Sequence, residues 1–287
     1  MKYVVITAAR NEEKYIENTL RSVCSQTLKP TKWVIVSDSS TDRTDEIVRE
    51  YARDNPFISL LCRSGDKKRN FGSQVYAINA GYDTIKDMEF DLIGNLDADV
   101  SFEPKYFETL AERISANPRI GIAGGWIQER QNNLFCDRKS NSLTSVPHAV
   151  QLFRRDCFVQ IGGYTPLRYG GPDWLAEIMA RMNGWEVMPF VDLKVAHHRP
   201  TNGADNGFKG AWRDGFRAYS IGSHPVFEAV KTIRRIPKWS DVPYSILRFI
   251  GFIVAYIKHS KREPSPEVIR YLRKEQMSRL FAFVFKQ

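Results

Sequence analysis

The chain has 287 residues, of which 43% are hydrophobic and 26% are charged, and its formal net charge is +9. This length and composition suit one large folded domain, or one domain with an extension, and exclude a disordered chain. The positive charge favours contact with phosphates, nucleic acid or an anionic membrane surface, without choosing among them.

The first hundred residues alternate short apolar runs with segments of helical periodicity. Strands are predicted over 3–7, 33–36, 58–62 and 91–95, with helices between them. This alternation predicts an α/β fold with a mostly parallel sheet flanked by helices. In such sheets, ligands bind at the carboxyl ends of the strands.

The second half has a less regular pattern. Residues 120–127 predict a strand, and the polar residues 128–146 predict a long loop, a kind of segment that is usually functional or mobile. A helix is expected over 172–183, followed by short strands at 185–190 and 195–198. From about residue 203 the pattern predicts only helices. We therefore expect a domain of residues 1–202 and a helical extension of residues 203–287.

The clearest chemical signal follows the fourth predicted strand. Asp97 and Asp99 are separated by one residue, and alternate side chains of an extended segment point the same way. Both carboxylates can therefore bind one hard cation, Mn²⁺ or Mg²⁺, which would also take phosphate oxygens of a substrate. Two aspartates separated by one residue also occur by chance in exposed turns. The position of this pair at the end of a predicted strand is what favours a metal site.

Polar residues also follow the first two predicted strands. No glycine stands in residues 7–12, where a dinucleotide-binding Rossmann unit needs a glycine-rich turn, which argues against a dehydrogenase. Asp38, after the second strand, can accept a hydrogen bond from a ribose hydroxyl or a base N–H. Capping of the next helix is the alternative role for Asp38.

Four stretches in register, 4–12, 36–42, 68–72 and 96–99, resemble a family-2 glycosyltransferase with the GT-A fold. The resemblance covers roughly residues 1–200. It implies that residues 1–202 are a catalytic domain that binds a nucleotide diphosphate-sugar. The residues that it places at the nucleotide-sugar are Thr7, Ala9, Asn11, Glu12, Asp38, Arg69 and Asp97. Arg69 belongs to a basic run that would also suit a solvated helix start.

The resemblance also implies a general base within the stretch 170–174, where two glycines precede Pro172 and Asp173. Asp173 would remove the proton of the acceptor hydroxyl while that oxygen attacks the anomeric carbon with inversion. A helix cap is the alternative role for Asp173, and Glu177, one turn later, is the second choice for the base. On the acceptor side we expect four residues: Trp126, Gly163, Tyr164 and Trp174. Core packing is an equal alternative for Trp126.

His197 and His198 follow the last predicted strand. Imidazole is a common ligand for manganese, and the resemblance places a histidine near this position at the metal or the diphosphate. We prefer His197 as the metal ligand, with His198 as the alternative.

Two other functions are compatible with parts of the pattern. A nucleotidyltransferase also uses paired aspartates and a metal, but it would carry a glycine-rich, basic loop after the first strand, where only Arg10 stands. A nucleic-acid-binding module would suit the charge but lacks a stacking or zinc motif. We therefore expect a nucleotide diphosphate-sugar donor, a glycan or lipid-linked acceptor, and no nucleic acid.

The segment 220–262 interleaves basic with apolar residues, and its most apolar run, 246–257, is too short to span a bilayer. We expect the extension to lie on an anionic membrane surface. Packing against the first domain, or against a second subunit in a homodimer, is the alternative. No cleavable signal follows the first residues, and the four cysteines show no paired spacing. The expected location is therefore the cytoplasm, including the cytosolic face of a membrane.

Overall fold

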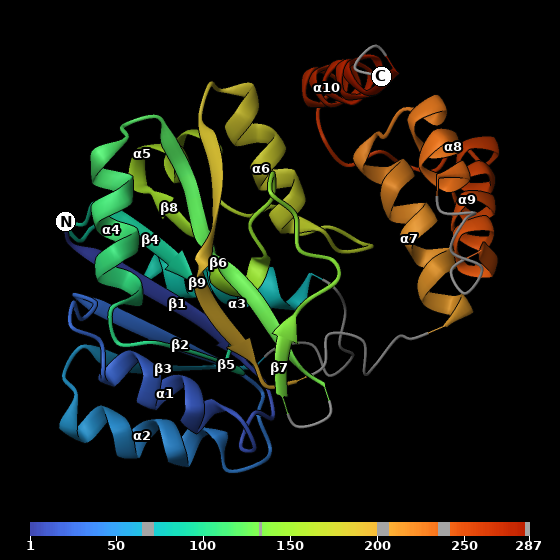
Figure 1. Cartoon of the computed structure of the whole chain (residues 1–287). Helices are drawn as coiled ribbons and strands as arrows, with labels where there is room; N and C mark the ends of the chain where they lie inside the picture. Colours follow the sequence, from blue (N-terminus) through green and yellow to red (C-terminus); the bar gives the residue numbers. More distant parts are fainter. Residues whose placement is uncertain (65–71, 132–133, 200–206, 235–241, 285–287) are drawn as a thin grey trace. The chain divides into compact units, whose positions relative to one another are not determined.

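The computed structural model describes residues 1–64, 72–131, 134–199, 207–234 and 242–284. The chain divides into two compact units, one of residues 1–166 and 172–201, the other of residues 167–171 and 202–287. Within the described residues, the first unit is a sheet with helices, and the second is helical (Figure 1).

The first unit contains all the strands that the described residues form. These strands are β1 Tyr3–Ala9, β2 Lys32–Asp38, β3 Ile58–Arg63, β4 Leu92–Asn95, β5 Val100–Phe102, β6 Ile120–Gln131, β7 Leu134–Asp137, β8 Leu152–Arg154 and β9 Glu186–His197. Its helices are α1 Ile16–Cys24, α2 Thr44–Asp54, α3 Ser73–Asp83, α4 Tyr106–Ala116, α5 Arg155–Gln160 and α6 Pro172–Met182, with a 3₁₀ turn, η1, at His148–Val150.

The strands form one mixed sheet in the order β3-β2-β1-β4-β8-β6-β9-β5, and β7 pairs with β6. Strands β3, β2, β1 and β4 are parallel to one another. Strand β8 is antiparallel to its neighbours β4 and β6, and β5 is antiparallel to β9. The predicted α/β fold class is therefore correct, and the carboxyl ends of β1, β2 and β4 lie along one edge of the sheet.

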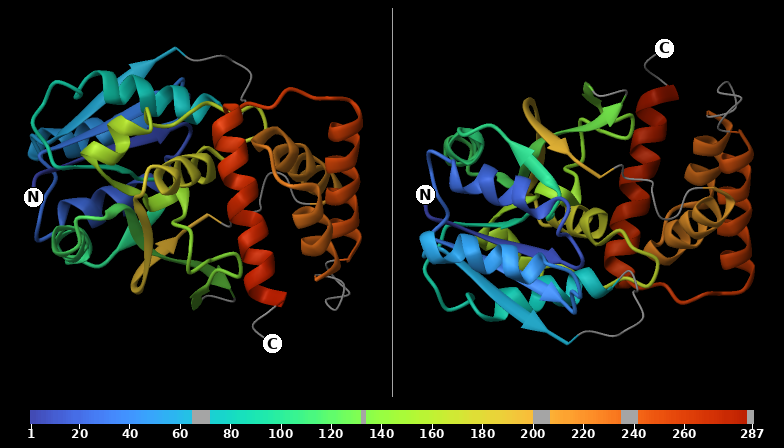
Figure 2. Two further views of the ribbon diagram at one scale, coloured as in Figure 1. Left: turned by 90° about the horizontal axis from the view of Figure 1, so that it is seen from above. Right: turned by 90° about the horizontal axis from the view of Figure 1, so that it is seen from below.

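Helices cover both faces of this sheet (Figure 2). Side chains of β1 alternate between the faces: Tyr3 and Val5 pack in the cluster with α1, α2 and α4, whereas Val4 and Ile6 pack in the cluster with α3, α5 and α6. This alternation follows from the period of two in a strand, and it explains why the run is apolar throughout.

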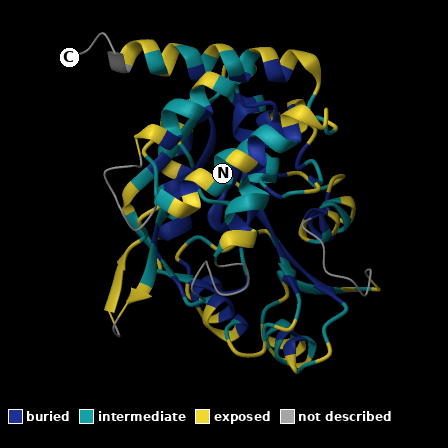
Figure 3. Cartoon of the chain, turned by 90° about the vertical axis from the view of Figure 1, so that its right-hand side faces the viewer, coloured by how far each residue is buried: buried dark blue, intermediate teal, exposed yellow. Residues whose placement is uncertain are grey.

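Two expectations for the second half are wrong in detail. Residues 128–146 are not one loop, because β6 continues to Gln131 and pairs with β7, whose residues are all exposed (Figure 3). The two short strands expected at 185–190 and 195–198 are one strand, β9. Its pairing with β6 shifts register between Gly125 and Trp126, whose partners are Phe190 and Lys194. The polar residues Asp192 and Lys194 interrupt the apolar pattern at the same place.

The second unit contains α7 Phe208–Ile221, α8 Pro225–Ile233, α9 Val242–Ile257 and α10 Pro266–Val284. Helices α7 and α9 pack backbone against backbone: a Cβ built on Gly215 would lie 2.1 Å from the carbonyl oxygen of Arg248, and one on Gly251 would lie 2.5 Å from that of Trp212. None of the helices that the described residues form is long and apolar enough to cross a bilayer.

Candidate active site

The loops after β1 and β2 are joined by side-chain hydrogen bonds. Asn11, in a left-handed conformation with φ 55°, accepts a hydrogen bond at Oδ1 from the backbone N–H of Thr41 at 2.8 Å. The backbone N–H of Glu12 donates to Thr44 Oγ1 at 2.7 Å. The Asn11 side chain therefore holds the two strand ends together.

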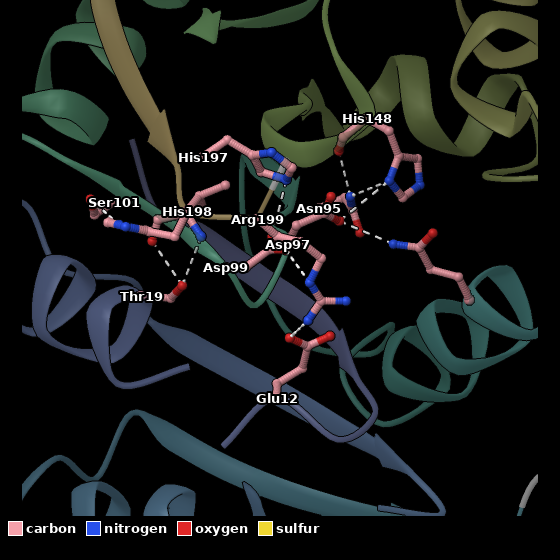
Figure 4. A network of polar contacts seen from close by, with 12 residues as sticks. Glu12, Thr19, Asn95, Asp97, Asp99, Ser101, His148, His197, His198 and Arg199 are labelled. Carbon is pink, nitrogen blue, oxygen red and sulfur yellow. Dashed lines mark hydrogen bonds and ion pairs between the residues drawn. The ribbon is translucent and has the colours of Figure 1, made fainter. Parts of the chain in front are cut away.

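Asp97, Asp99 and His197 come together at the carboxyl edge of the sheet (Figure 4). Each offers one ligand atom, and these atoms all lie within 4.8 Å of one another. His197 Nε2 lies 3.3 Å from Asp99 Oδ1. An octahedral ion with bonds of about 2.1 Å separates adjacent ligand atoms by about 3 Å and opposite ones by about 4.2 Å. The 3.3 Å separation of His197 and Asp99 is close to that of adjacent ligand positions, and two carboxylates with one imidazole are a ligand set that suits Mn²⁺ or Mg²⁺.

Strand pairing explains how residues so distant in the sequence meet. The antiparallel register of β5 and β9 places His197 opposite Val100, the residue after Asp99. The next histidine, His198, points elsewhere, because its Nε2 lies 2.8 Å from Ser101 Oγ in a hydrogen bond. The structure therefore brings His197 to the aspartates and keeps His198 away from them.

Arg199 connects Asp99 to the loop after β1. Its Nη2 forms a hydrogen-bonded ion pair with Glu12, and its Nε lies 3.4 Å from Asp99 Oδ2. The guanidinium also lies 5.5 Å from the ring of Tyr15. The carboxylate expected at the nucleotide, Glu12, is thus engaged by Arg199 and helps to fix Asp99.

Asp97 is held by two side chains that the sequence did not single out. Gln74 Nε2 donates to Asp97 Oδ1 at 3.0 Å, and His148 Nδ1 lies 3.5 Å from the same oxygen. Asn95 Nδ2 in turn donates to the carbonyl oxygen of His148 at 2.6 Å. Burial alone would raise the pKa of Asp97, but the hydrogen bond and charge of His148, with the charge of His197 and the hydrogen bond from Gln74, lower that pKa overall.

The same contact acts on the histidine. Burial alone would lower the pKa of His148, and its pairing with Asp97 raises it overall. No motif surrounds His148 in the sequence, so only the tertiary contact reveals it.

Asp38 is buried at the end of β2, as its place in the sequence predicts. Arg63 Nε lies 3.4 Å from its Oδ1, yet that oxygen accepts no hydrogen bond from the described residues. A buried acceptor left open costs about 1–3 kcal/mol, so Asp38 is suited to a donor group on a ligand. Arg69, the other residue expected here, lies outside the described residues.

Two residues expected at the nucleotide have their side chains in the core. Thr7 is completely buried, and its hydroxyl accepts a hydrogen bond from Trp33 Nε1 at 2.9 Å. Ala9 is 2% exposed and packs in the cluster with α1 and α2. A ligand at this strand end can meet these residues only through their backbone.

The two acidic residues of α6 have different environments. Asp173 is half-buried in the first turn. Glu177 is 1% exposed and accepts hydrogen bonds from the backbone N–H of Val146 at 2.6 Å and from Ser145 Oγ at 3.0 Å. Burial, assisted by the charge of Asp173, raises the pKa of Glu177 to about 8. Glu177 therefore ties α6 to the segment before η1, and Asp173 is the more accessible carboxylate.

The residues expected on the acceptor side do not share one environment. Tyr164 is buried, and its hydroxyl donates to Gln151. Gly163 has φ +68°, and a Cβ there would lie 3.0 Å from the ring of Phe158. Trp126 and Trp174 are half-buried. Gly163 and Tyr164 thus shape the turn after α5, while the two tryptophans are partly exposed.

Arg138 is a further cation near the candidate site. It is half-buried, and its Nε has no hydrogen-bond partner among the described residues. Burial lowers its pKa, while the charges of Glu129, Asp173 and Asp97 act against that effect. A half-buried guanidinium with an open donor is suited to an anionic ligand.

A family model described as glycosyl transferase family 2 matches residues 4–170. The chain belongs to this family. The family resemblance predicted from the four sequence stretches is thereby confirmed, and the nucleotidyltransferase and nucleic-acid-binding alternatives lose their support.

The chain is similar to the poly-beta-1,6-N-acetyl-D-glucosamine synthase of Staphylococcus aureus (strain COL), with 23% identity over 193 residues. That match covers 61% of this chain and 43% of the relative. The glucosyl-dolichyl phosphate glucuronosyltransferase of Haloferax volcanii is 26% identical over 188 residues, covering 57% of this chain and 56% of the relative. The matches thus span about half the length of each relative.

Solved structures of low sequence identity share the fold. The mannosyltransferase PcManGT from Pyrobaculum calidifontis, in complex with GDP-Man and Mn²⁺, superposes with a TM-score of 0.59 at 16% identity, covering 98% of this chain and 80% of that one. S. aureus TarS 1–349 in complex with UDP-GlcNAc gives a TM-score of 0.58 at 16% identity, covering 77% and 66%. These likenesses confirm the GT-A type of fold.

Proposed function

We propose that this protein is a metal-dependent, inverting glycosyltransferase that moves a sugar from a nucleotide diphosphate-sugar to an acceptor hydroxyl. The observation that carries the proposal is the convergence of Asp97, Asp99 and His197 at the carboxyl edge of the sheet. Membership of glycosyl transferase family 2 supports it.

Asp97, Asp99 and His197 would hold Mn²⁺ or Mg²⁺, since carboxylate oxygens and one imidazole suit either ion. Bound there, the cation would neutralise charge on the leaving diphosphate. Gln74 and His148 keep the Asp97 carboxylate in place, and Arg199 does the same for Asp99. The chain therefore orients both carboxylates by contacts of its own.

The donor would lie along the ends of β1 and β2. Asp38 offers an open, buried acceptor for a ribose hydroxyl or base N–H. Arg138 offers an open donor that can bind the diphosphate or the sugar. UDP-GlcNAc and GDP-Man in the two structural neighbours support a nucleotide-sugar donor for this chain as well.

Asp173 would act as the base. It would take the proton of the acceptor hydroxyl while the oxygen–carbon bond forms at the anomeric carbon and the bond to the diphosphate breaks. A single displacement of this kind inverts the anomeric carbon. Glu177 is less suited to the role, because it is buried and already bonded to Ser145 and Val146.

For the acceptor we propose a glycan or a lipid-linked sugar. One relative is named for synthesis of a β-1,6-linked N-acetylglucosamine polymer, and the other for transfer to a glucosyl-dolichyl phosphate. These names support the two acceptor classes equally.

The test is a screen of UDP- and GDP-sugars for transfer or hydrolysis with Mn²⁺, Mg²⁺ or chelator, together with calorimetric titration of Mn²⁺. We expect one donor class to react only with metal present. Asp99→Asn should lose measurable Mn²⁺ binding and turnover while keeping the thermal unfolding of the parent. Asp83→Asn, at an exposed aspartate on α3, is the matched control and should change neither. Full turnover in chelator, or in Asp99→Asn, would refute metal dependence.

A further inference from the structure

The positive charge of the chain is concentrated in its last 85 residues. Residues 1–202 contain 26 Lys and Arg and 26 Asp and Glu, whereas residues 203–287 contain 16 and 7. The first stretch is therefore neutral, and the entire net charge of +9 lies in the second. A charge balance so divided indicates that the C-terminal part has an anionic partner of its own.

Helix α9 carries a row of exposed isoleucines. Ile246, Ile250 and Ile257 are 47%, 44% and 69% exposed. Their spacing, with Ile253 between them, places them on one side of a helix within about 60°. The opposite side packs on α7 through Gly251, Phe252 and Ala255. A helix that is apolar all round belongs in a core or in lipid, so the exposed side of α9 needs a cover.

An exposed aromatic pair lies where the start of α9 meets α7. Phe208 of α7 stacks on Tyr244 of α9 with ring centroids 5.4 Å apart, and the two are 61% and 45% exposed. Tyr244 lies about 160° around α9 from Ile246, on the side toward α7, so this pair is separate from the isoleucine row. We call the exposed residues Ile246, Ile250 and Ile257 the α9 face.

The charges around the α9 face are cationic. Lys258 and Lys261 are exposed just after the isoleucine row. Each carboxylate that the structure describes between residues 207 and 262 is paired with an arginine: Asp214 with Arg217 at 3.1 Å, and the buried Glu228 with Arg248. Arg248, the one charged residue within α9, is therefore turned inward by Glu228, and the row stays free of charge.

We propose that the α9 face binds an anionic membrane surface, with α9 lying in the plane of the interface. The helix has 16 residues and is about 24 Å long, shorter than the roughly 30 Å hydrocarbon core, so it suits the interface rather than a span. Aliphatic isoleucines insert among acyl chains, whereas nucleic acid calls for stacking or hydrogen-bonding groups. A second copy would bring another strongly positive surface against this one, which is unfavourable.

The full chain is tested by co-sedimentation with vesicles of phosphatidylcholine alone or with about 30% phosphatidylglycerol. We expect binding to the anionic vesicles at low salt, weak binding to the neutral ones, and partial release at about 1 M salt, where the Debye length falls to about 3 Å. Lys258→Gln with Lys261→Gln should lower the partition coefficient about 30-fold, since each cation near the surface contributes about 1 kcal/mol. Ile250→Ser with Ile257→Ser should lower it at least tenfold.

The controls are Lys105→Gln and Val159→Ser, which change an exposed cation and an exposed apolar residue of the first unit. Both should bind vesicles as the parent does, and all variants should keep the parent's thermal unfolding. Several results would overturn the proposal. They are equal binding to neutral and anionic vesicles, unchanged binding in the α9 variants, and a dimer that the isoleucine variants dissociate without any vesicle binding by the parent. Tight binding of an oligonucleotide that the lysine variants abolish, in a protein that ignores vesicles, would identify nucleic acid as the partner instead.

Discussion

Replacing Glu177 by glutamine should stabilise the protein at neutral pH and leave the proposed base in place. Glutamine keeps the shape of the side chain, and its carbonyl oxygen can accept the hydrogen bonds that Val146 and Ser145 now donate. What the substitution removes is the ability to ionise, and with it the ion pair in which Arg181 Nη1 lies 3.7 Å from Glu177 Oε2. The side chain is 1% exposed, so an ionised carboxylate there would be poorly solvated.

The size of the effect follows from the pKa of Glu177, which burial raises from 4.5 to about 8. Between these two values the folded state holds a proton that the unfolded state has lost, so stability falls as pH rises, by about 1.4 kcal/mol per unit. The penalty is absent below the unfolded value of 4.5, amounts to about 3 kcal/mol at pH 7, and is constant above the folded value. Glu177→Gln escapes the penalty at every pH.

Differential scanning calorimetry of parent and Glu177→Gln from pH 4.5 to 9 measures this difference. In a domain of about 200 residues, 3 kcal/mol corresponds to a shift of about 6–12 °C, and the shift should appear in the transition of the first unit. Glu112→Gln, at an exposed glutamate on α4, should show no such trend. A difference that does not grow with pH would refute the reasoning, because it would mean that Glu177 is ionised in the folded state.

Two further variants test the candidate site. Asp173→Asn should keep donor affinity and lower kcat by about 10²–10⁴-fold in steady-state assays, because an amide cannot take the proton; lost donor binding would instead move Asp173 to the nucleotide. His148→Ala should weaken Mn²⁺ binding about 10–100-fold in calorimetric titration, because His148 orients Asp97, and His148→Gln should recover part of it. Equal affinity in parent and His148→Ala would exclude that positioning role.

The parallel half of the sheet was predictable because its signals are local. Strands β1 and β2 are apolar runs bounded by polar turns, and the alternation of β1 between two cores accounts for the unbroken run. Asp97 and Asp99 follow β4 directly, so their position at the edge comes from the chain order alone. Such features need no knowledge of long-range pairing.

The missed features depend on contacts between distant segments. Strands β5 and β8 have three residues each, too few to show a period. Gln74 and His148 meet Asp97 from α3 and η1, and neither segment has a pattern that points to the site. The choice between His197 and His198 depended on which of the two is paired with Val100, next to Asp99. The register of β9 against β5 decides this, and the sequence alone does not show that register. Thr7 looked available at a strand end, but Trp33 occupies its hydroxyl.

The division of charge between the two stretches of the chain implies that the two proposed binding events respond differently to salt. Three of the groups proposed to hold the donor and the metal, Asp38, Asp99 and His197, are each less than 9% exposed, and Asp97 and Arg138 are half-buried. Such groups are little screened, so donor and metal affinity should fall only modestly with ionic strength. Lys258 and Lys261 are exposed. The attraction of exposed cations to an anionic surface decays over one Debye length, which is only about 3 Å at 1 M salt, so high salt should remove most of it. A salt titration followed by donor binding and by vesicle binding on the same sample should therefore give two curves. Two curves of equal steepness would mean that the donor site relies on the same exposed cations as the membrane contact.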